Sequence, residues 1–299
     1  MLMNVNRWLK TYAQDLNGQV VAITGANGGI GSCLCRYLVQ LHAKVIMLDR
    51  NVEKSNQVRE TLLKEFPDAV IEVIALDLNR VQNVRDVVEQ LSNRQIDFLV
   101  LNAGVYNVPL EPGELGYNNV FQVNFIAQYY LAKSLLPTLA RCKGKIIATS
   151  SIVHRYYTTN PDDIDSAKDT KQMRVYGNAK RYLTFALAEL LKKQTDVQLA
   201  LVHPGLTATK MTNHYHPAIN WLVVGGMKVL FPRPEKAALN LLAGFFQTPD
   251  NDEWLGPKTA GLWGAPTASK LSITPEERAQ IFQTAERIDA VIREFIVTA

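Results

Sequence analysis

Short apolar runs alternate with longer stretches of helical periodicity over the first two thirds of the chain. The apolar runs predict six strands, which cover residues 20–24, 44–48, 70–76, 96–101, 145–149 and 197–202. Helical spacing of apolar residues predicts helices between them, over residues 30–41, 51–66, 81–91, 116–140 and 175–193. Because strands that alternate with helices form parallel βαβ units, we expect an α/β fold. Its core would be a doubly wound parallel sheet of six to seven strands with helices on both faces.

The last third of the chain has a less regular pattern. Residues 218–231 are apolar but are interrupted by two glycines and a lysine, so they suit either a core helix or a flap over a substrate pocket. We favour the flap and place it at about residues 210–232. A helix is predicted over residues 234–246, and a capping box begins a last helix within about residues 274–297. Since neither a linker nor an internal repeat is visible, we expect one domain over residues 1–299.

Composition and charge narrow the class of protein. Apolar residues make up 47% of the chain and charged residues 20%, which is typical of a globular protein with an ample core. The net charge of +4 comes without a dense basic run, so neither nucleic acid nor a membrane surface is an expected partner. No signal peptide or spanning segment is visible, and we therefore expect a cytoplasmic protein. The three cysteines argue against a disulfide framework, and packing is the expected use of Cys33 and Cys35.

A glycine-rich loop follows the first predicted strand. Its glycines stand in a G-x-x-x-G-x-G spacing between that strand and a helix. Glycines there permit a tight turn, close approach of the backbone to a pyrophosphate and tight packing of the helix on the strand. The N–H groups at the helix start would face the phosphates, favoured by the helix dipole. We therefore expect a Rossmann-type dinucleotide site formed by Thr24, Gly25, Asn27, Gly28, Gly29, Ile30 and Gly31.

Asp49, at the end of the second predicted strand, bears on the choice between NAD and NADP. It lies 18 residues past Gly31, where a carboxylate can accept hydrogen bonds from an adenosine ribose. A carboxylate there also repels a 2′-phosphate. Arg50 argues the other way, because a guanidinium pairs well with phosphate. The residue before Gly29 is Gly28 rather than a lysine or an arginine. We expect NAD as the cofactor, with NADP as the alternative.

Polar and small residues also follow the other predicted strands. Ligands of a doubly wound sheet bind outside the carboxyl ends of the strands, so these residues are candidates for the same site. They are Asp77 with Leu78, Asn102, Ala103, Gly104, Ser151, Pro204 and Gly205. Each alone suits a turn, but their joint occurrence at successive strand ends indicates a binding site.

Two Tyr-x-x-x-Lys pairs each place a phenol and an ammonium on one helical face. The ammonium is expected to lower the pKa of the phenol, so that the tyrosine can act as general acid and base near neutral pH. Tyr176 and Lys180 follow the strand that ends at Ser151, whose hydroxyl could converge with the phenol on one substrate oxygen. Tyr129 and Lys133 lie in an apolar helix, where packing is their expected use. We therefore assign the chemistry to Tyr176.

Together these motifs resemble those of the short-chain dehydrogenase/reductases over residues 19–209. The matching residues are those of the glycine-rich loop, followed in order by Asp77, Asn102-Ala103-Gly104, Asn124, Ser151, Tyr176 with Lys180, Pro204-Gly205 and Thr209. The C-terminal segment and a polar insertion before Tyr176 are most similar to the retinol dehydrogenase and protochlorophyllide reductase branch of that family.

The resemblance implies hydride transfer between a nicotinamide and a carbinol or carbonyl carbon. Tyr176 would exchange the proton with the substrate oxygen, while Lys180 lowers its pKa and holds the nicotinamide ribose. Ser151, the second of two adjacent serines, would hydrogen-bond the substrate oxygen, and Asn124 would support a water-linked proton path. The family pattern also implies cofactor contacts, from Asp77 to the adenine, from Asn102 to the cofactor and the central strand, and from Thr209 to the carboxamide.

The chain departs from the family pattern between Ser151 and Tyr176, which are 25 residues apart, a longer spacing than is usual. The additional residues, roughly 157–172, are polar, and we expect an exposed loop beside the pocket. Since family members commonly assemble around the tyrosine helix, this insertion could hinder the usual tetramer, and a homo-oligomer is left open. Four histidines lack the spacing of a metal site, and no metal is expected at His154, His203, His214 or His216.

Two other function classes are weaker alternatives. A regulator that senses NAD(P) without turnover would be expected to lack the tyrosine, the lysine or the serine, and all three are present. A sugar-nucleotide epimerase would want a different glycine spacing and a larger substrate domain. We therefore predict an oxidoreductase that interconverts a primary or secondary alcohol and its carbonyl. Its substrate would be a small and largely apolar molecule, with steroid, retinoid, acyl and xenobiotic carbonyls all left open.

Overall fold

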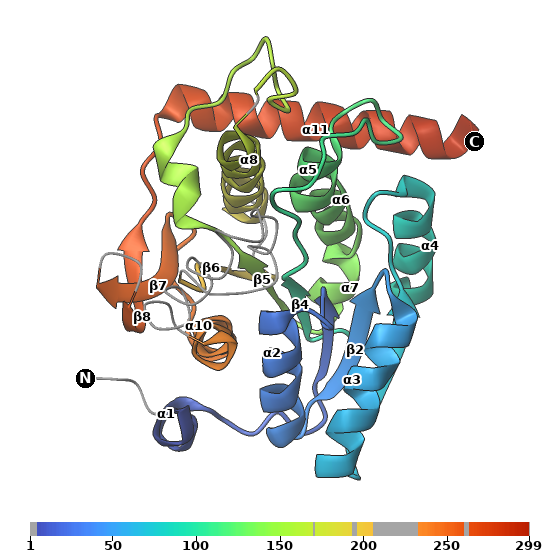
Figure 1. Ribbon diagram of the computed structural model, residues 1–299, viewed down its shortest axis with the longest axis vertical. Helices are drawn as coiled ribbons and strands as arrows, with labels where there is room; N and C mark the ends of the chain where they lie inside the picture. The colour runs from blue at the N-terminus through green and yellow to red at the C-terminus, as the bar shows by residue number, and fades with distance from the viewer. Residues whose placement is uncertain (1–4, 170, 193–195, 206–232, 260–262, 299) are drawn as a thin grey trace, which may run out of the picture.

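The computed structural model of the protein describes residues 5–169, 171–192, 196–205, 233–259 and 263–298 (Figure 1). Within these ranges, one eight-stranded sheet has the order β3-β2-β1-β4-β5-β6-β7-β8. The strands are β1 (Val20–Thr24), β2 (Lys44–Asp49), β3 (Ile71–Ala75), β4 (Phe98–Leu101), β5 (Lys145–Thr149), β6 (Gln198–Val202), β7 (Glu253–Thr259) and β8 (Trp263–Lys270). All are parallel except β8, which runs antiparallel to β7. The predicted α/β fold with a doubly wound parallel sheet is confirmed.

Helices cover both faces of the sheet, and each face has its own core (Figure 1). One face carries α2 (Gly29–Gln40), α3 (Val52–Glu65) and α10 (Pro234–Phe246), with α1 (Val5–Tyr12) against α10. The other face carries α4 (Val81–Ser92), α6 (Ala127–Ser134), α8 (Gln172–Lys192) and α11 (Pro275–Thr298). Successive residues of a strand point to opposite faces, so Val21 and Ile23 enter the first core and Ala22 enters the second. Burial on both faces explains why the central strands read as continuous apolar runs.

The sheet has more strands than the six to seven predicted. The additional pair, β7 and β8, extends the sheet beyond β6. The sequence of β8, WGAPTASK, is mostly small or polar, and most of its described side chains are exposed. It therefore has neither the apolar run of a buried strand nor strict alternation. Pro257 and Pro266, which lie opposite each other in the β7–β8 register, also weaken the strand signal.

The single helix predicted over residues 116–140 is wrong, because this region is divided into four pieces. They are α5 (Asn119–Phe121), the π-helical turn η1 (Gln122–Ile126), α6 and α7 (Leu136–Arg141). Asn118 starts the first piece, since its side chain accepts a hydrogen bond from the N–H of Phe121 at 2.8 Å. The Asn124 side chain donates to the carbonyl oxygen of Val120 at 2.8 Å, which widens the helix at η1. Pro137 then falls in the first turn of α7, a position that tolerates proline.

The predicted C-terminal helix is present as α11, which lies across α8 and reaches α4 (Figure 1). The hydroxyl of Thr274 accepts a hydrogen bond from the N–H of Glu277 at 3.2 Å and caps its start. Buried side chains recur every three or four positions along it, at Ile281, Ala285, Ile288, Ile292 and Ile296. This stripe packs into the same core as α8, which fixes α11 against the sheet domain.

Some predictions fall outside the described residues. Thr209 and the flap at about residues 210–232 are among them. Of the helices that the structure describes, none has the length and apolar character required to cross a bilayer.

Candidate active site

The glycine-rich loop joins β1 to α2 in a geometry that suits a pyrophosphate. Gly25 has a φ of +68°, and a Cβ there would lie 2.8 Å from the Cα of Ala103. A Cβ on Gly31 would lie 2.1 Å from the carbonyl oxygen of Gly25, so both positions require glycine. Gly28 precedes α2 and provides no side-chain cap for its first N–H groups. The loop therefore fits the phosphates of a dinucleotide, which would meet an open helix N-terminus. Gly29 and Ile30 are the first two residues of that helix.

Thr24 and Asn102 fasten this loop to the end of β4. The hydroxyl of Thr24 accepts hydrogen bonds from the N–H groups of Asn102 and Ala103, each at 3.0 Å. The Asn102 amide in turn donates to the carbonyl oxygens of Thr24 at 3.1 Å and of Gly25 at 3.0 Å. These hydrogen bonds join the ends of the neighbouring parallel strands β1 and β4.

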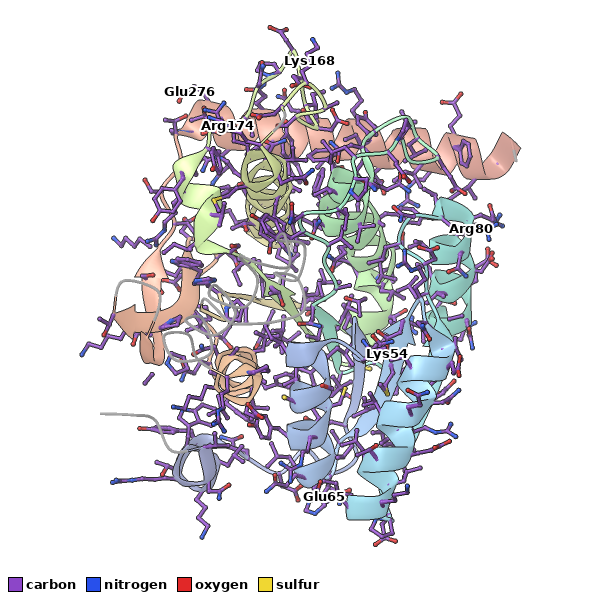
Figure 2. The ribbon with its side chains drawn as sticks, viewed as in Figure 1. Lys54, Glu65, Arg80, Lys168, Arg174 and Glu276 are labelled. Carbon is purple, nitrogen blue, oxygen red and sulfur yellow. The ribbon has the colours of Figure 1, made fainter. Side chains whose placement is uncertain are left out.

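Asp49 closes β2 and faces the glycine-rich loop. Its buried carboxylate accepts hydrogen bonds from the hydroxyl of Ser55 at 2.9 Å and from the N–H of Asn27 at 3.3 Å. Burial raises the pKa of Asp49, although these hydrogen bonds oppose the shift. Arg50 is exposed beside it, and Lys54 on α3 donates to the side chain of Asn27 at 3.3 Å (Figure 2). Sequence reasoning missed Ser55 and Lys54, whose only signal is their place in the first turn of α3.

Asp77 and Leu78 follow β3 at the same edge. The carboxylate of Asp77 accepts a hydrogen bond from the N–H of Asn79 at 3.0 Å and so shapes its own turn. The N–H of Asp77 donates to the side chain of Asn83 at 2.7 Å, while Leu78 is buried. The adenine contact assigned to Asp77 stays a prediction.

Ser151, Tyr176, Lys180 and Asn124 come together around the backbone of Gly104. The Ser151 side chain lies close enough to the Tyr176 hydroxyl to lower its pKa. The Lys180 ammonium lies 5.9 Å from the centre of the Tyr176 ring and donates to the carbonyl oxygen of Thr149 at 2.9 Å. A Cβ on Gly104 would lie 2.6 Å from the Asn124 side-chain oxygen and 3.8 Å from the Lys180 nitrogen. The four predicted side chains therefore share one site at the carboxyl ends of the strands.

Tyr106 is part of this site and was missed from the sequence. Its ring packs edge-on against that of Tyr176, with the ring centres 5.4 Å apart. It lies two residues after Gly104, in the loop that follows β4. That proximity to a predicted strand end was its only signal.

The pKa of Tyr176 differs in direction from the sequence expectation. Burial raises it to about 12, and the hydrogen bond with Ser151 offsets only part of that shift. Burial also lowers the pKa of Lys180 to about 8. Lys180 is not among the described causes of that shift, and its ammonium donates to the carbonyl oxygen of Thr149, so the lowering expected from Lys180 stays a prediction.

The two adjacent serines have different surroundings. The hydroxyl of Ser150 is hydrogen-bonded at 2.8 Å to that of Thr184, which lies further along α8 than Tyr176. That of Ser151 faces Tyr176 and accepts a weaker hydrogen bond from the N–H of Val153 at 3.4 Å. Adjacent residues leaving a strand point to opposite sides, which accounts for the difference. The catalytic role of Ser151 stays a prediction.

The insertion after Ser151 is not simply an exposed loop. It begins with a short 3-10 helix, η2 (Ile152–Tyr156), and it is fastened at several points to the helices beneath it. The carboxylate of Asp165 is buried and accepts a hydrogen bond from the N–H of Asn118 at 2.6 Å. The Asn178 amide donates to the carbonyl oxygen of Ile164 at 2.7 Å. Lys168 projects at the outer tip of the insertion, and Arg174 lies below it in the first turn of α8 (Figure 2), so only part of the segment matches the expectation of an exposed loop.

The end of β6 also reaches the site. The carbonyl oxygen of Pro204 accepts a hydrogen bond from Asn240 at 3.0 Å, and Gly205 has a φ of +87°. His203 stacks on Trp254, with the ring centres 5.2 Å apart, and His154 packs edge-on against the same ring. In the part of the chain that the structure describes, no three His, Cys, Asp or Glu side chains gather as a metal site would require.

Comparison with known proteins identifies the family. The family model described as short chain dehydrogenase matches residues 19–220. Retinol dehydrogenase 14 of Mus musculus is 27% identical over 277 residues, which cover 87% of this chain and 75% of that protein. Short-chain dehydrogenase TIC 32 A, chloroplastic, of Brassica napus is 30% identical over 222 residues, which cover 68% of each chain.

Solved structures agree on the fold. A protein from Mycobacterium paratuberculosis has a TM-score of 0.73 at 21% identity, covering 98% of both chains. A short-chain dehydrogenase from Sphingobium yanoikuyae in complex with NADPH has a TM-score of 0.58 at 22% identity, covering 76% of this chain and 84% of that one. The chain thus belongs to the short-chain dehydrogenase family of oxidoreductases, near its retinol dehydrogenase-like branch.

Proposed function

We propose that the protein is an NAD(P)-dependent oxidoreductase that interconverts a primary or secondary alcohol and its carbonyl. The observation that carries this proposal is the grouping of Ser151, Tyr176 and Lys180 at the strand ends next to the glycine-rich loop, with the Lys180 ammonium 5.9 Å from the centre of the Tyr176 ring. Membership of an oxidoreductase family supports it.

The cofactor would lie across the carboxyl ends of the strands. Gly25 and Gly31 leave room for its pyrophosphate, and the first N–H groups of α2 would face the phosphate oxygens. We expect Asn102, Pro204 and Gly205, which follow β4 and β6, to contact the cofactor as well. When bound, the cofactor supplies or accepts the hydride.

The protein's own contribution is to hold and move one proton at the substrate oxygen. In carbonyl reduction, the Tyr176 hydroxyl donates its proton to that oxygen, and in alcohol oxidation it takes the proton back. Ser151 donates a hydrogen bond to the same oxygen and holds it in place. The Lys180 ammonium favours the phenolate electrostatically as it forms, and the Asn124 side chain stands beside Lys180 on a path for proton replacement.

We propose NAD as the preferred cofactor, with NADP as the alternative. Asp49 supports this preference, because its carboxylate lies against the loop and would repel a 2′-phosphate while accepting from a ribose. In Asp49→Asn, the ratio of kcat/KM for NAD to that for NADP should fall by about tenfold or more. Arg50→Ala should instead raise the ratio, and an unchanged ratio in both variants would contradict the assignment.

We further propose that the chain is one domain acting on a small, largely apolar substrate. The buried stripe of α11, which lies outside the family match, joins the same core as α8. The ring of Tyr106 packs edge-on against that of Tyr176, so an aromatic side chain lies next to the proposed catalytic hydroxyl, which suits an apolar substrate.

Cofactor binding and turnover, measured together, test the proposed function. Cofactor fluorescence should report binding, and a panel of ketones and aldehydes should be reduced with consumption of NADH or NADPH. Gly31→Ala should abolish binding, since its Cβ would meet the Gly25 carbonyl. Tyr176→Phe should bind the cofactor normally and lose nearly all turnover, by about 10²-fold or more. Tight binding by the wild type without turnover of any substrate would favour the alternative, a regulator that senses NAD(P).

A further inference from the structure

The C-terminal helix α11 contacts the helix that carries Tyr176 through a buried ion pair. Arg181, which follows Lys180 directly, donates from Nε to Oε1 of Glu277 at 2.7 Å and from a second nitrogen to Oε2. The Arg181 side chain is only 5% exposed and that of Glu277 14%. A fork-to-fork pair of this kind is both strong and directional. It fixes the guanidinium of Arg181 beside the proposed active site.

The same guanidinium also holds the turn that follows Ser151. Its third nitrogen donates to the carbonyl oxygen of His154 in η2 at 2.9 Å. His154 in turn holds Ser151, because its backbone N–H donates to the Ser151 carbonyl oxygen at 3.1 Å and its ring Nδ1 donates to that oxygen at 2.6 Å. An unbroken chain of hydrogen bonds therefore runs from Glu277 to the backbone of Ser151.

Glu277 also accepts hydrogen bonds from the insertion. Its Oε1 accepts hydrogen bonds from the N–H of Thr159 at 2.9 Å and from the Thr159 hydroxyl at 3.2 Å. One carboxylate thus holds the segment after Ser151 at two points, at His154 through Arg181 and at Thr159 directly. Because both groups of the ion pair are largely buried, removing either partner would leave the other charge uncompensated.

We propose that Glu277, acting through Arg181, is a positioning residue that sets the Ser151 hydroxyl against the Tyr176 hydroxyl. The proposal rests on the function proposed above, since positioning matters only if the two hydroxyls act on one substrate oxygen. A reacting group displaced by about 1 Å can cost a large part of the rate. The C-terminal helix, outside the matched family region, would then complete the geometry of the site.

Substitutions at the ion pair and elsewhere on α11 distinguish positioning of Ser151 from anchoring of the helix α11. Glu277→Ala and the milder Glu277→Gln should lower kcat by about 10- to 100-fold, with the cofactor KM changed less than about twofold. Arg181→Lys, which keeps the charge but loses the fork, should do the same. Glu276→Gln is the matched control, because Glu276 is the preceding, exposed residue at the start of α11 (Figure 2). Glu286→Gln is the control for anchoring, since Glu286 ties α11 to Lys133 instead.

A double-mutant cycle with Ser151→Ala tests whether the effect passes through the serine hydroxyl. If Glu277 acts by placing that hydroxyl, Glu277→Ala should add less than about a twofold loss of kcat in a Ser151→Ala background. A full additional loss there, or a wild-type kcat in Glu277→Ala measured well below its melting temperature, would overturn the proposal.

Amide hydrogen exchange supplies a readout that does not depend on turnover. The His154 N–H, which donates to Ser151, should exchange at least about tenfold faster in Glu277→Ala than in the wild type, and at the wild-type rate in Glu286→Gln. If no substrate is turned over, the proposed function fails while exchange still decides whether Glu277 holds the turn. Unchanged exchange at His154 would refute the positioning role even in an active enzyme.

Discussion

The two Tyr-x-x-x-Lys pairs have the same spacing and opposite surroundings. The hydroxyl of Tyr129 donates to Glu286 at 2.7 Å, and Lys133 lies between Glu286 at 2.7 Å and Asp289 at 2.9 Å. That pair joins α6 to α11, and packing, its expected use, is what the structure shows. In the other pair, Tyr176 meets the hydroxyl of Ser151, and Lys180 donates to a backbone carbonyl rather than to a carboxylate.

The difference shows what makes a tyrosine useful as an acid and base. Burial and the adjacent Glu286 carboxylate both disfavour the phenolate of Tyr129, so its pKa is raised far beyond the ordinary value. The ammonium of Lys133 forms ion pairs with the carboxylates of Glu286 and Asp289. Tyr176 has no carboxylate among the described partners that shift its pKa, and Lys180 donates to a backbone carbonyl rather than to a carboxylate that would neutralise its charge. The Tyr-x-x-x-Lys spacing puts the phenol and the ammonium on one helical face. The neighbouring side chains then determine whether the pair is suited to acid–base catalysis or to stabilising the fold.

Replacing the two phenols should give the sharpest contrast. Tyr176→Phe should lower kcat by about 10²- to 10⁴-fold, because the proton donor is lost. Tyr129→Phe should leave kcat within about twofold and lower the free energy of unfolding by about 1 kcal/mol, because one hydrogen bond to a charged group is lost. Steady-state kinetics and urea unfolding of both variants check this. Equal losses of kcat would end the distinction between the pairs.

Replacing the two lysines should separate rate from stability. Lys180→Met should lower kcat by about 10²-fold, since the charge that favours the phenolate is removed. Lys133→Met removes one of the two cations paired with the buried Asp289 and leaves only Arg293, so it should lower the free energy of unfolding by about 1–3 kcal/mol while sparing kcat. Chemical denaturation and initial rates measure the two effects. A stable but inactive Lys133→Met would contradict the comparison.

The adjacent serines extend the contrast within the site. Ser151→Ala should lower kcat by about 10- to 100-fold, as one hydrogen bond to the reacting oxygen is lost. Ser150→Ala should chiefly lower stability, by about 1 kcal/mol, because the buried hydroxyl of Thr184 loses one of its two hydrogen bonds. The paired comparison of kcat and melting temperature tests this, and a more damaging Ser150→Ala would reverse the assignment of the two residues.

The smallest expected effect is on the pH profile. Lys180 has a pKa lowered to about 8 by burial, so its ammonium is lost as the pH rises through that value. The kcat/KM for carbonyl reduction should therefore fall above about pH 8. Lys180→Arg, which stays charged, should remove this fall, whereas Tyr129→Phe should leave the profile unchanged. A profile flat to pH 10 in the wild type would show that the charge of Lys180 is not needed.

Local sequence signals predicted the framework well. The runs at residues 20–24 and 145–149 match β1 and β5 because a strand buried on both faces must be apolar throughout. The last helix was visible because its capping box and its Pro275 are local features. Gly25 and Gly31 could be predicted because both belong to a short glycine spacing, and a Cβ at either position would meet the backbone nearby.

Several of the failures involve contacts between distant residues. Asn118 sets the start of the helical segment by capping α5, and its backbone N–H donates to Asp165 of the insertion, 47 positions away. Glu277 meets Arg181 across 96 positions, and no periodicity signals that contact. Burial is the largest cause of the raised pKa of Tyr176, and the Tyr-x-x-x-Lys spacing alone does not reveal that burial.

The proline pair of β7 and β8 has a consequence for how the protein meets its neighbours. Neither Pro257 nor Pro266 has an N–H, so the two can face each other only where the ladder makes no hydrogen bond. At that register, the backbone of Pro266 is turned towards the open side of the sheet, where β8 is the last strand described. A strand from another molecule that approached this border would find no donor there. The edge strand β8 thus resists pairing with a strand of another molecule, which would extend the sheet into an aggregate.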